Sequence, residues 1–196
     1  MNLLKGKPVA EKLALHIQET VAYLLEKNIV PTLAIVRVGE NSSDIAYENS
    51  AVKKAESLGI HVEKFILDQD AAEGDLIDIL KFINESESIH GVLLFRPLPS
   101  HMDEDRVRNH LDADKDIDGI TDGSLAGIFT GNGTGYPPCT AEAAMAILQH
   151  YGVETAGKKA VQVYDTVDDI YFCTAGDVHL YDLHRIPPEE ADGDEE

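Results

Sequence analysis

Cysteine is scarce in this sequence, which has only Cys139 and Cys173 among its 196 residues. Two cysteines are too few for the disulfide framework that stabilises small secreted domains. We therefore expect a protein of the reducing cytoplasm.

Long apolar runs are also missing. No run approaches the length that a membrane span needs, and the first eight residues contain no signal-peptide core. We expect neither a membrane protein nor a secreted one, which agrees with a cytoplasmic location.

Basic residues are few: 16 Lys and Arg stand against 36 Asp and Glu, so the formal charge is −20. Such a charge argues against binding to nucleic acid or to anionic membranes. The acids are concentrated at the end of the chain, where eleven of them follow Tyr164 and Arg185 is the one base. We expect an acidic tail over residues 165–196 that is partly disordered.

The apolar residues that are present follow a regular alternation of helical and strand patterns. Helices are predicted over residues 8–27, 42–58, 75–84 and 103–111 and in a segment to residue 151 capped by Thr140, and strands over residues 32–38, 61–67, 91–95 and 158–164. This alternation predicts an α/β fold, with a parallel sheet between helices in a three-layer αβα arrangement.

An acidic loop, DKDIDGI at residues 114–120, interrupts this pattern and leads into a Gly-rich segment over residues 123–135. No helix or strand period fits the Gly-rich segment, which we expect to be a loop. Because ligands bind beyond the carboxyl ends of parallel strands, we expect Tyr47, Arg96, Pro97 and Asp118 to line one cleft. The alternative for the acidic loop is a solvated turn whose aspartates cap helices.

Four segments of the sequence together resemble one enzyme family. VRVGENSSDIAY, GVLLFRPLP, DKDIDGI and PPCTAEA, in this order and spacing, are similar to methylenetetrahydrofolate dehydrogenase/cyclohydrolase. The resemblance covers roughly residues 1–160. It implies a catalytic α/β domain, a Rossmann domain for NADP, a cleft for tetrahydrofolate between them, and usually a homodimer. The family interconverts methylene-, methenyl- and formyl-tetrahydrofolate.

The match to the family's catalytic residues is partial. In the motif S-x-x-Y-x-x-x-K the tyrosine is Tyr47, but Asp44 stands at the serine position and Ala51 at the position of the catalytic lysine. Phe95 replaces the glutamine of V-Q-L-P-L-P, whereas Asp118 keeps the folate-binding carboxylate of D-x-D-G. In the P-C-T motif, which is kept, the usual following proline is Ala141. The resemblance therefore implies a substrate site formed by Tyr47, Phe95, Pro97 and Asp118.

Two interpretations of the missing lysine stay open. In the first, the chain has lost the family's chemistry, because alanine supplies no proton. In the second, Lys54 or Arg96 takes over as the catalytic cation. Lys54 lies on the same predicted helix face as Tyr47 and Ala51, and Arg96 directly follows Phe95. In the first case Lys54 is simply a solvated helix charge.

The family's cofactor turn, G-x-S-x-x-V-G, falls at Tyr164, Asp165 and Thr166, and both glycines are absent. Nearby aspartates repel a polyanionic cofactor, so we expect no NADP site. No metal site is expected either, since His179 and His184 are more typical of surface histidines.

The predicted domains are a folate-binding domain over residues 1–139, a helix and the first strand of a vestigial cofactor domain over 140–164, and the tail over 165–196. The Rossmann domain is expected to be essentially missing, through divergence or an interrupted reading frame.

Two classes of function follow. The first is a dehydrogenase/cyclohydrolase that is impaired, with its dehydrogenase step lost. The second is a non-catalytic folate-binding or interaction protein, and a truncated gene product without a role of its own is the alternative to both. The expected partners are a tetrahydrofolate derivative and a second copy of the chain, in a homodimer or a larger assembly.

Overall fold

A computed structural model of the chain describes residues 4–156, 159–163, 170–174 and 177–179. The contacts divide the chain into two compact units, of which the larger is Lys5–Met145 and the second holds residues 146–196 and the first four residues. Each is described by itself.

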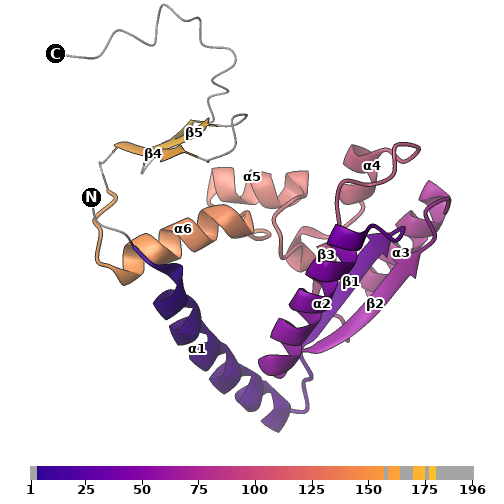
Figure 1. Cartoon of the computed structure of the whole chain (residues 1–196), viewed down its shortest axis with the longest axis horizontal. Helices are drawn as coiled ribbons and strands as arrows, with labels where there is room; N and C mark the ends of the chain where they lie inside the picture. The colour runs from indigo at the N-terminus through magenta and orange to yellow at the C-terminus, as the bar shows by residue number, and fades with distance from the viewer. Residues whose placement is uncertain (1–3, 157–158, 164–169, 175–176, 180–196) are drawn as a thin grey trace, which may run out of the picture. The chain divides into compact units, whose positions relative to one another are not determined.

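The larger unit contains three strands and most of the helices (Figure 1). In chain order they are α1 (Gly6–Glu26), β1 (Thr32–Val38), α2 (Ser42–Ser57), β2 (His61–Leu67), α3 (Glu73–Glu85), β3 (Gly91–Leu94), α4 (Glu104–Arg108), a 3-10 helix (Ala113–Lys115) and α5 (Asp122–Thr130).

The three strands form one parallel sheet in the order β2-β1-β3. Thr32 of β1 is aligned with His61 of β2, and Leu33 is aligned with Gly91 of β3. Strand β1 is therefore central, which explains why almost all its residues are buried. The predicted parallel α/β sheet is confirmed.

Helices cover both faces of this sheet. Ala34 and Val36 of β1 point to the main core, where they pack with Leu76 and Leu80 of α3 and with Val107 of α4. The alternate residues of β1 face α2, to which Arg37 makes an ion pair. Helix α2 accordingly lies on the near side of the strands in Figure 1, and the three-layer arrangement is confirmed for this unit.

The prediction that the Gly-rich segment is a loop was wrong, because residues 122–130 form α5. Thr121 caps the helix by accepting a hydrogen bond from Ser124 N, and Gly131 ends it with a φ of 66°. Gly127 lies against the carbonyl of Thr134, where a Cβ atom has no room. The glycines therefore serve close packing and the helix end, rather than a flexible loop.

The end of α4 and the start of α6 also differ from the prediction. Helix α4 ends at Arg108, and the chain then turns so that Leu111 is buried without being helical. Helix α6 (Cys139–His150), which crosses the boundary between the two units, makes its first helical hydrogen bond from Glu142 N to Pro138 O at 3.1 Å. Thr140 consequently lies inside the first turn and is not the cap.

In the second unit the described backbone forms an antiparallel sheet of β4 (Lys159–Val163), β5 (Ile170–Thr174) and β6 (Asp177–His179). The predicted strand over residues 158–164 is present as β4. Its pairing is antiparallel, so it does not extend the parallel sheet that the alternation predicted. The expected tail beyond residue 179 lies outside the described residues.

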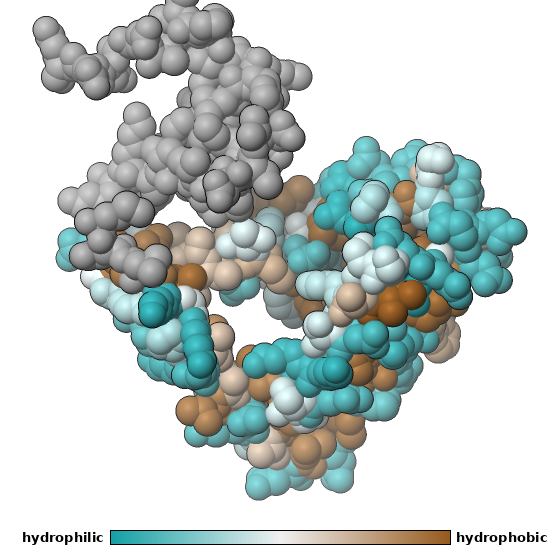
Figure 2. Space-filling view, viewed as in Figure 1, coloured by the Kyte–Doolittle hydropathy of each residue, from teal (hydrophilic) through white to brown (hydrophobic). Residues whose placement is uncertain are grey.

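The surface of the described residues is polar in most places, with apolar areas between (Figure 2). Leu13, Leu15, Tyr23 and Leu25 of α1 are exposed, and Phe129 of α5 has 88% of its surface exposed. In the described part of the chain, no helix has both the length and the apolar character of a membrane span.

Candidate functional site

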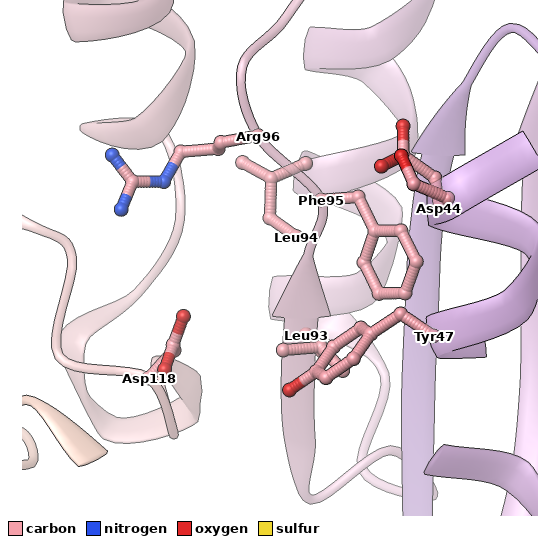
Figure 3. Close-up of a pocket in the computed structure, with 8 residues that line it drawn as sticks. Asp44, Tyr47, Leu93, Leu94, Phe95, Arg96 and Asp118 are labelled. Carbon is pink, nitrogen blue, oxygen red and sulfur yellow. The ribbon is translucent and has the colours of Figure 1, made fainter. Parts of the chain in front are cut away.

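A pocket of about 340 Å³ opens at the carboxyl ends of β1 and β3. Its wall comes from three segments that are distant in sequence: the first turns of α2, the end of β3, and the acidic loop (Figure 3). The lining residues are Ser43, Asp44, Tyr47, Leu93, Leu94, Phe95, Arg96 and Asp118.

The first wall depends on how α2 begins. Asn41 caps the helix, and its side chain accepts hydrogen bonds from the backbone N–H and the hydroxyl of Ser43. One turn later, Tyr47 stands on the surface with 60% of its area exposed. Its ring lies 5.5 Å from that of Phe95, measured between centroids. Helix α2 thus presents an aromatic face to the pocket.

The second wall is the end of β3. Phe95 is buried, and its N–H donates to Val36 O at 2.9 Å, so the sheet pairing continues one residue past the strand. Arg96 follows, joined to Pro97 by a cis peptide bond. Its guanidinium pairs with Glu104 at 3.1 Å, and the other oxygen of Glu104 accepts from Leu98 N at 3.0 Å. Glu104 therefore offsets the positive charge of Arg96.

The third wall is the acidic loop, which Asp116 holds in place. Asp116 is fully buried and accepts hydrogen bonds from Ile120 N, Thr121 N and Ser124 Oγ at 3.1, 2.8 and 2.7 Å. The tight turn leaves Asp118 in the pocket wall. The solvated-turn alternative is wrong for Asp116, since a fully buried carboxylate with three donors fixes the loop.

Gly119 allows the loop to pack closely on the segment before α6. It has a φ of 65°, and a Cβ atom there would lie 2.6 Å from Tyr136 O and Pro138 N. Only glycine combines this backbone conformation with this approach. The D-x-D-G spacing thus places one carboxylate inside the fold and the next in the pocket.

Cys139 lies beside Asp118 and donates a hydrogen bond to Ile117 O at 3.3 Å. The residue as a whole is exposed. Burial of its sulfur, together with the neighbouring Asp118 carboxylate, nevertheless raises the pKa of the thiol to about 11. A thiol with such a pKa stays protonated at neutral pH and is a poor nucleophile.

A buried ion cluster lies on the inner side of α2, and the sequence analysis did not identify it. Glu48 is only 5% exposed and accepts from Arg37 Nε at 2.7 Å, while Lys64 Nζ lies 3.0 Å from its other oxygen. Burial tends to raise the pKa of Glu48, but the two cations hold it below its usual value. An arginine within a buried apolar strand was the available signal, because it requires a partner.

The structure brings together Tyr47, Phe95, Arg96 and Asp118, as the sequence predicted. Pro97 is exposed and does not line the pocket, and neither does Lys54, which is exposed further along α2. Four lining residues, Ser43, Asp44, Leu93 and Leu94, were not among the predicted site residues. Tyr164, Asp165 and Thr166 lie outside the described residues.

Comparison with known proteins identifies the domain. Residues 4–118 match the family model described as "Tetrahydrofolate dehydrogenase/cyclohydrolase, catalytic domain". This chain belongs to that family. The acidic loop with Asp118 closes the matched range, and the first turns of α2 and the end of β3 lie within it.

Relatives of the family agree with this assignment. The chain is 44% identical over 160 residues to the bifunctional protein FolD of Alkaliphilus oremlandii, and 38% identical over 158 residues to that of Clostridioides difficile. These matches cover 82% and 81% of this chain, and 56% and 55% of the relatives. The chain thus spans about half the length of the curated relatives it matches.

Solved structures show the same fold. FolD methylenetetrahydrofolate dehydrogenase/cyclohydrolase from Campylobacter jejuni superposes with a TM-score of 0.78 at 30% identity, over 81% of this chain and 56% of that one. A Trypanosoma brucei FolD, solved with NADP cofactor and an inhibitor, superposes with a TM-score of 0.73 at 26% identity, over 80% of this chain and 54% of that one.

Among the described residues no three His, Cys, Asp or Glu side chains gather closely enough to hold a metal ion. Of the two histidines considered above, His184 lies outside the described residues, and only the backbone of His179 is described.

Proposed function

We propose that the Lys5–Met145 unit binds a tetrahydrofolate derivative in the pocket between Tyr47 and Asp118. The observation that carries this proposal is the convergence of these two side chains on one pocket in a catalytic domain of this family. They are far apart in sequence, and the fold brings both to the carboxyl edge of the sheet, where α/β proteins bind ligands.

The two residues suit a reduced folate chemically. The exposed ring of Tyr47 offers a flat apolar face to an aromatic or pterin ring. The Asp118 carboxylate accepts hydrogen bonds and therefore complements the N–H groups of an aminopyrimidine edge. Leu93, Leu94 and Phe95 supply the apolar remainder of the wall.

We infer that interconversion of one-carbon folates is slow in this chain. None of the described residues that line the pocket is a lysine, and Ala51 stands at the family's lysine position. Arg96 reaches the pocket but is paired with Glu104. A positioned acid–base group raises a rate by a factor of about 10²–10⁴. Its loss therefore slows the reaction more than it weakens substrate binding.

The dehydrogenase step needs a nicotinamide cofactor, which accepts the hydride when it is bound. The sequence at Tyr164, Asp165 and Thr166, where the family has its phosphate turn, lacks the glycines of that turn. The second candidate function is accordingly that of a folate-binding protein without catalysis. The missing lysine in the pocket favours it.

Self-association of this chain, in a homodimer or a larger assembly, stays a prediction.

Titration with 5-formyl-tetrahydrofolate, a stable reduced folate, tests the proposal. Tyr47→Ala and Asp118→Asn are each expected to weaken binding at least tenfold, because a stacking face or a charged hydrogen bond is lost. The matched controls, Tyr23→Ala on α1 and Asp114→Asn in the same loop, change exposed residues outside the pocket and should bind as wild type does. Absence of binding, or binding that both site variants retain, contradicts the proposal.

A further inference from the structure

The charges in the pocket wall are unbalanced. Asp44 and Asp118 contribute two carboxylates, and Arg96 is the one lining cation among the described residues. Because the guanidinium of Arg96 already pairs with Glu104, it offsets the pocket carboxylates only weakly. The wall therefore favours a ligand that carries positive charge.

Asp44 is the carboxylate without an evident structural partner. It is half-buried in the first turn of α2, beside the ring of Phe95 (Figure 3). Asn41 already caps α2. No hydrogen bond or ion pair within the described part of the chain reaches the Asp44 side chain, in contrast to Asp116 with its three donors.

We propose that Asp44 makes this pocket select the reduced folate whose one-carbon bridge is cationic. The inference rests on the proposed folate site. Among the folates that the family interconverts, the 5,10-methenyl form carries a delocalised positive charge over its N–CH–N bridge, whereas the methylene and formyl forms are neutral there. At an effective dielectric constant of about 20, a carboxylate in the pocket wall favours such a cation by about tenfold or more.

A purely structural role for Asp44 has a different signature. An acid in the first turn of α2 stabilises the helix through its dipole. If that were its only role, Asp44→Asn would lower the unfolding temperature and leave the ratio of affinities for charged and neutral folates unchanged. The ratio of these affinities in Asp44→Asn therefore distinguishes a role in ligand selection from a role in helix stability.

The experiment compares the dissociation constants of 5,10-methenyl- and 5-formyl-tetrahydrofolate, measured by calorimetry on the whole chain. A pH of about 6 slows spontaneous opening of the bridge. Wild type should bind the methenyl form about tenfold more tightly, and added salt should reduce this preference.

In Asp44→Asn the preference should fall to about twofold or less, while the affinity for the formyl form stays within about twofold of wild type. Asp70→Asn makes the same charge change at an exposed residue outside the pocket and should keep the wild-type ratio. Equal affinities in wild type, or an unchanged ratio in Asp44→Asn, overturn the inference while the folate site stands. If neither folate binds wild type, the proposed function itself has failed.

Discussion

The rings of Tyr47 and Phe95 meet at a centroid distance of 5.5 Å with their planes inclined by 53°. One ring comes from α2 and the other from the end of β3, so the contact joins two walls of the pocket. Phe95 is fixed by the sheet hydrogen bond to Val36, whereas Tyr47 remains exposed to a ligand. At the position where the family resemblance implies a glutamine, this chain thus has an apolar ring that packs against Tyr47, the ring that we propose to contact the ligand.

Replacing Asp116 with alanine should destabilise the domain strongly. The substitution leaves two buried N–H groups and the Ser124 hydroxyl without their acceptor, which is expected to cost about 3 kcal/mol or more. Urea unfolding of the whole chain measures the loss. Asp114→Ala, an exposed neighbour, should change stability by less than about 0.5 kcal/mol. Equal effects of the two substitutions would show that Asp116 does not hold the loop.

The ion cluster behind α2 predicts a specific dependence on pH. Since the pKa of Glu48 is lowered in the folded state from its usual value of 4.5, its stabilising contribution is present above pH 4.5. That contribution is lost as the pH falls through the folded-state pKa. The free energy of unfolding of wild type should exceed that of Glu48→Gln by about 2 kcal/mol at neutral pH. This difference should shrink in acid.

The control for this prediction is Glu56→Gln, at an exposed position of the same helix. It should show no comparable gap at neutral pH. A difference between wild type and Glu48→Gln that stays constant down to the acid transition would contradict the assigned pKa direction.

The sequence was sufficient for elements whose pattern is local. The β-branched run of β1 gave its bounds correctly, because a buried parallel strand is a short continuous apolar segment. The bounds of β2, which is mostly exposed or half-buried, came from its alternating pattern. Helix α5 was missed, since Gly127 within it packs against Thr134 and Gly135 after it packs against Ser124, and no local pattern contains these contacts. The pairing of Glu48 with Arg37 and Lys64 was missed for the same reason. It depends on the register that aligns Ile35 with Lys64 across two strands.

The pocket was predicted in part. The rule that ligands bind at the carboxyl edge of the sheet brought Tyr47, Arg96 and Asp118 together correctly. Lys54 was included on helical spacing alone, which fixes a helix face but not whether that face reaches the pocket. The pairing of Arg96 with Glu104 could not be foreseen, because it depends on how the chain turns after Pro97.

Cys139 should react slowly with iodoacetamide even though the residue is exposed. With its pKa raised to about 11, its thiolate fraction at pH 8 is about 100-fold below that of a thiol with a pKa of 9.0. The rate should rise about tenfold per pH unit until that pKa is reached. Mass spectrometry of a Cys173→Ser chain measures it, and Asp118→Asn should accelerate it. A rate equal to that of a free peptide thiol would refute the prediction.

Titration of the whole chain with NADP should give no heat beyond dilution. Asp165 lies at the family's phosphate turn, Asp168 and Asp169 follow closely, and the glycines that admit the phosphates are absent. The Trypanosoma brucei FolD, solved with NADP, is the positive control under the same conditions. Micromolar binding to this chain would show that the cofactor is held by other residues.

Introducing the family's lysine and glutamine should raise the rate of reaction within the existing pocket. Ala51→Lys combined with Phe95→Gln restores the family's two residue types beside Tyr47 and Asp118. This pair of changes should raise the hydrolysis of 5,10-methenyl-tetrahydrofolate by about 10²–10⁴ over the unmodified chain, as followed by the loss of methenyl absorbance. The control pair, Ala46→Lys with Phe82→Gln, changes exposed positions outside the pocket and should leave the rate at its starting value.

Any activity of the unmodified chain above the spontaneous rate should fall in Lys54→Ala or Arg96→Ala if either cation compensates for the lysine. Given the pairing of Arg96 with Glu104 and the place of Lys54 outside the pocket lining, we expect neither change to matter. A double variant that binds folate as wild type does yet gains no rate would show that the lysine and the glutamine are not sufficient to raise the rate in this pocket.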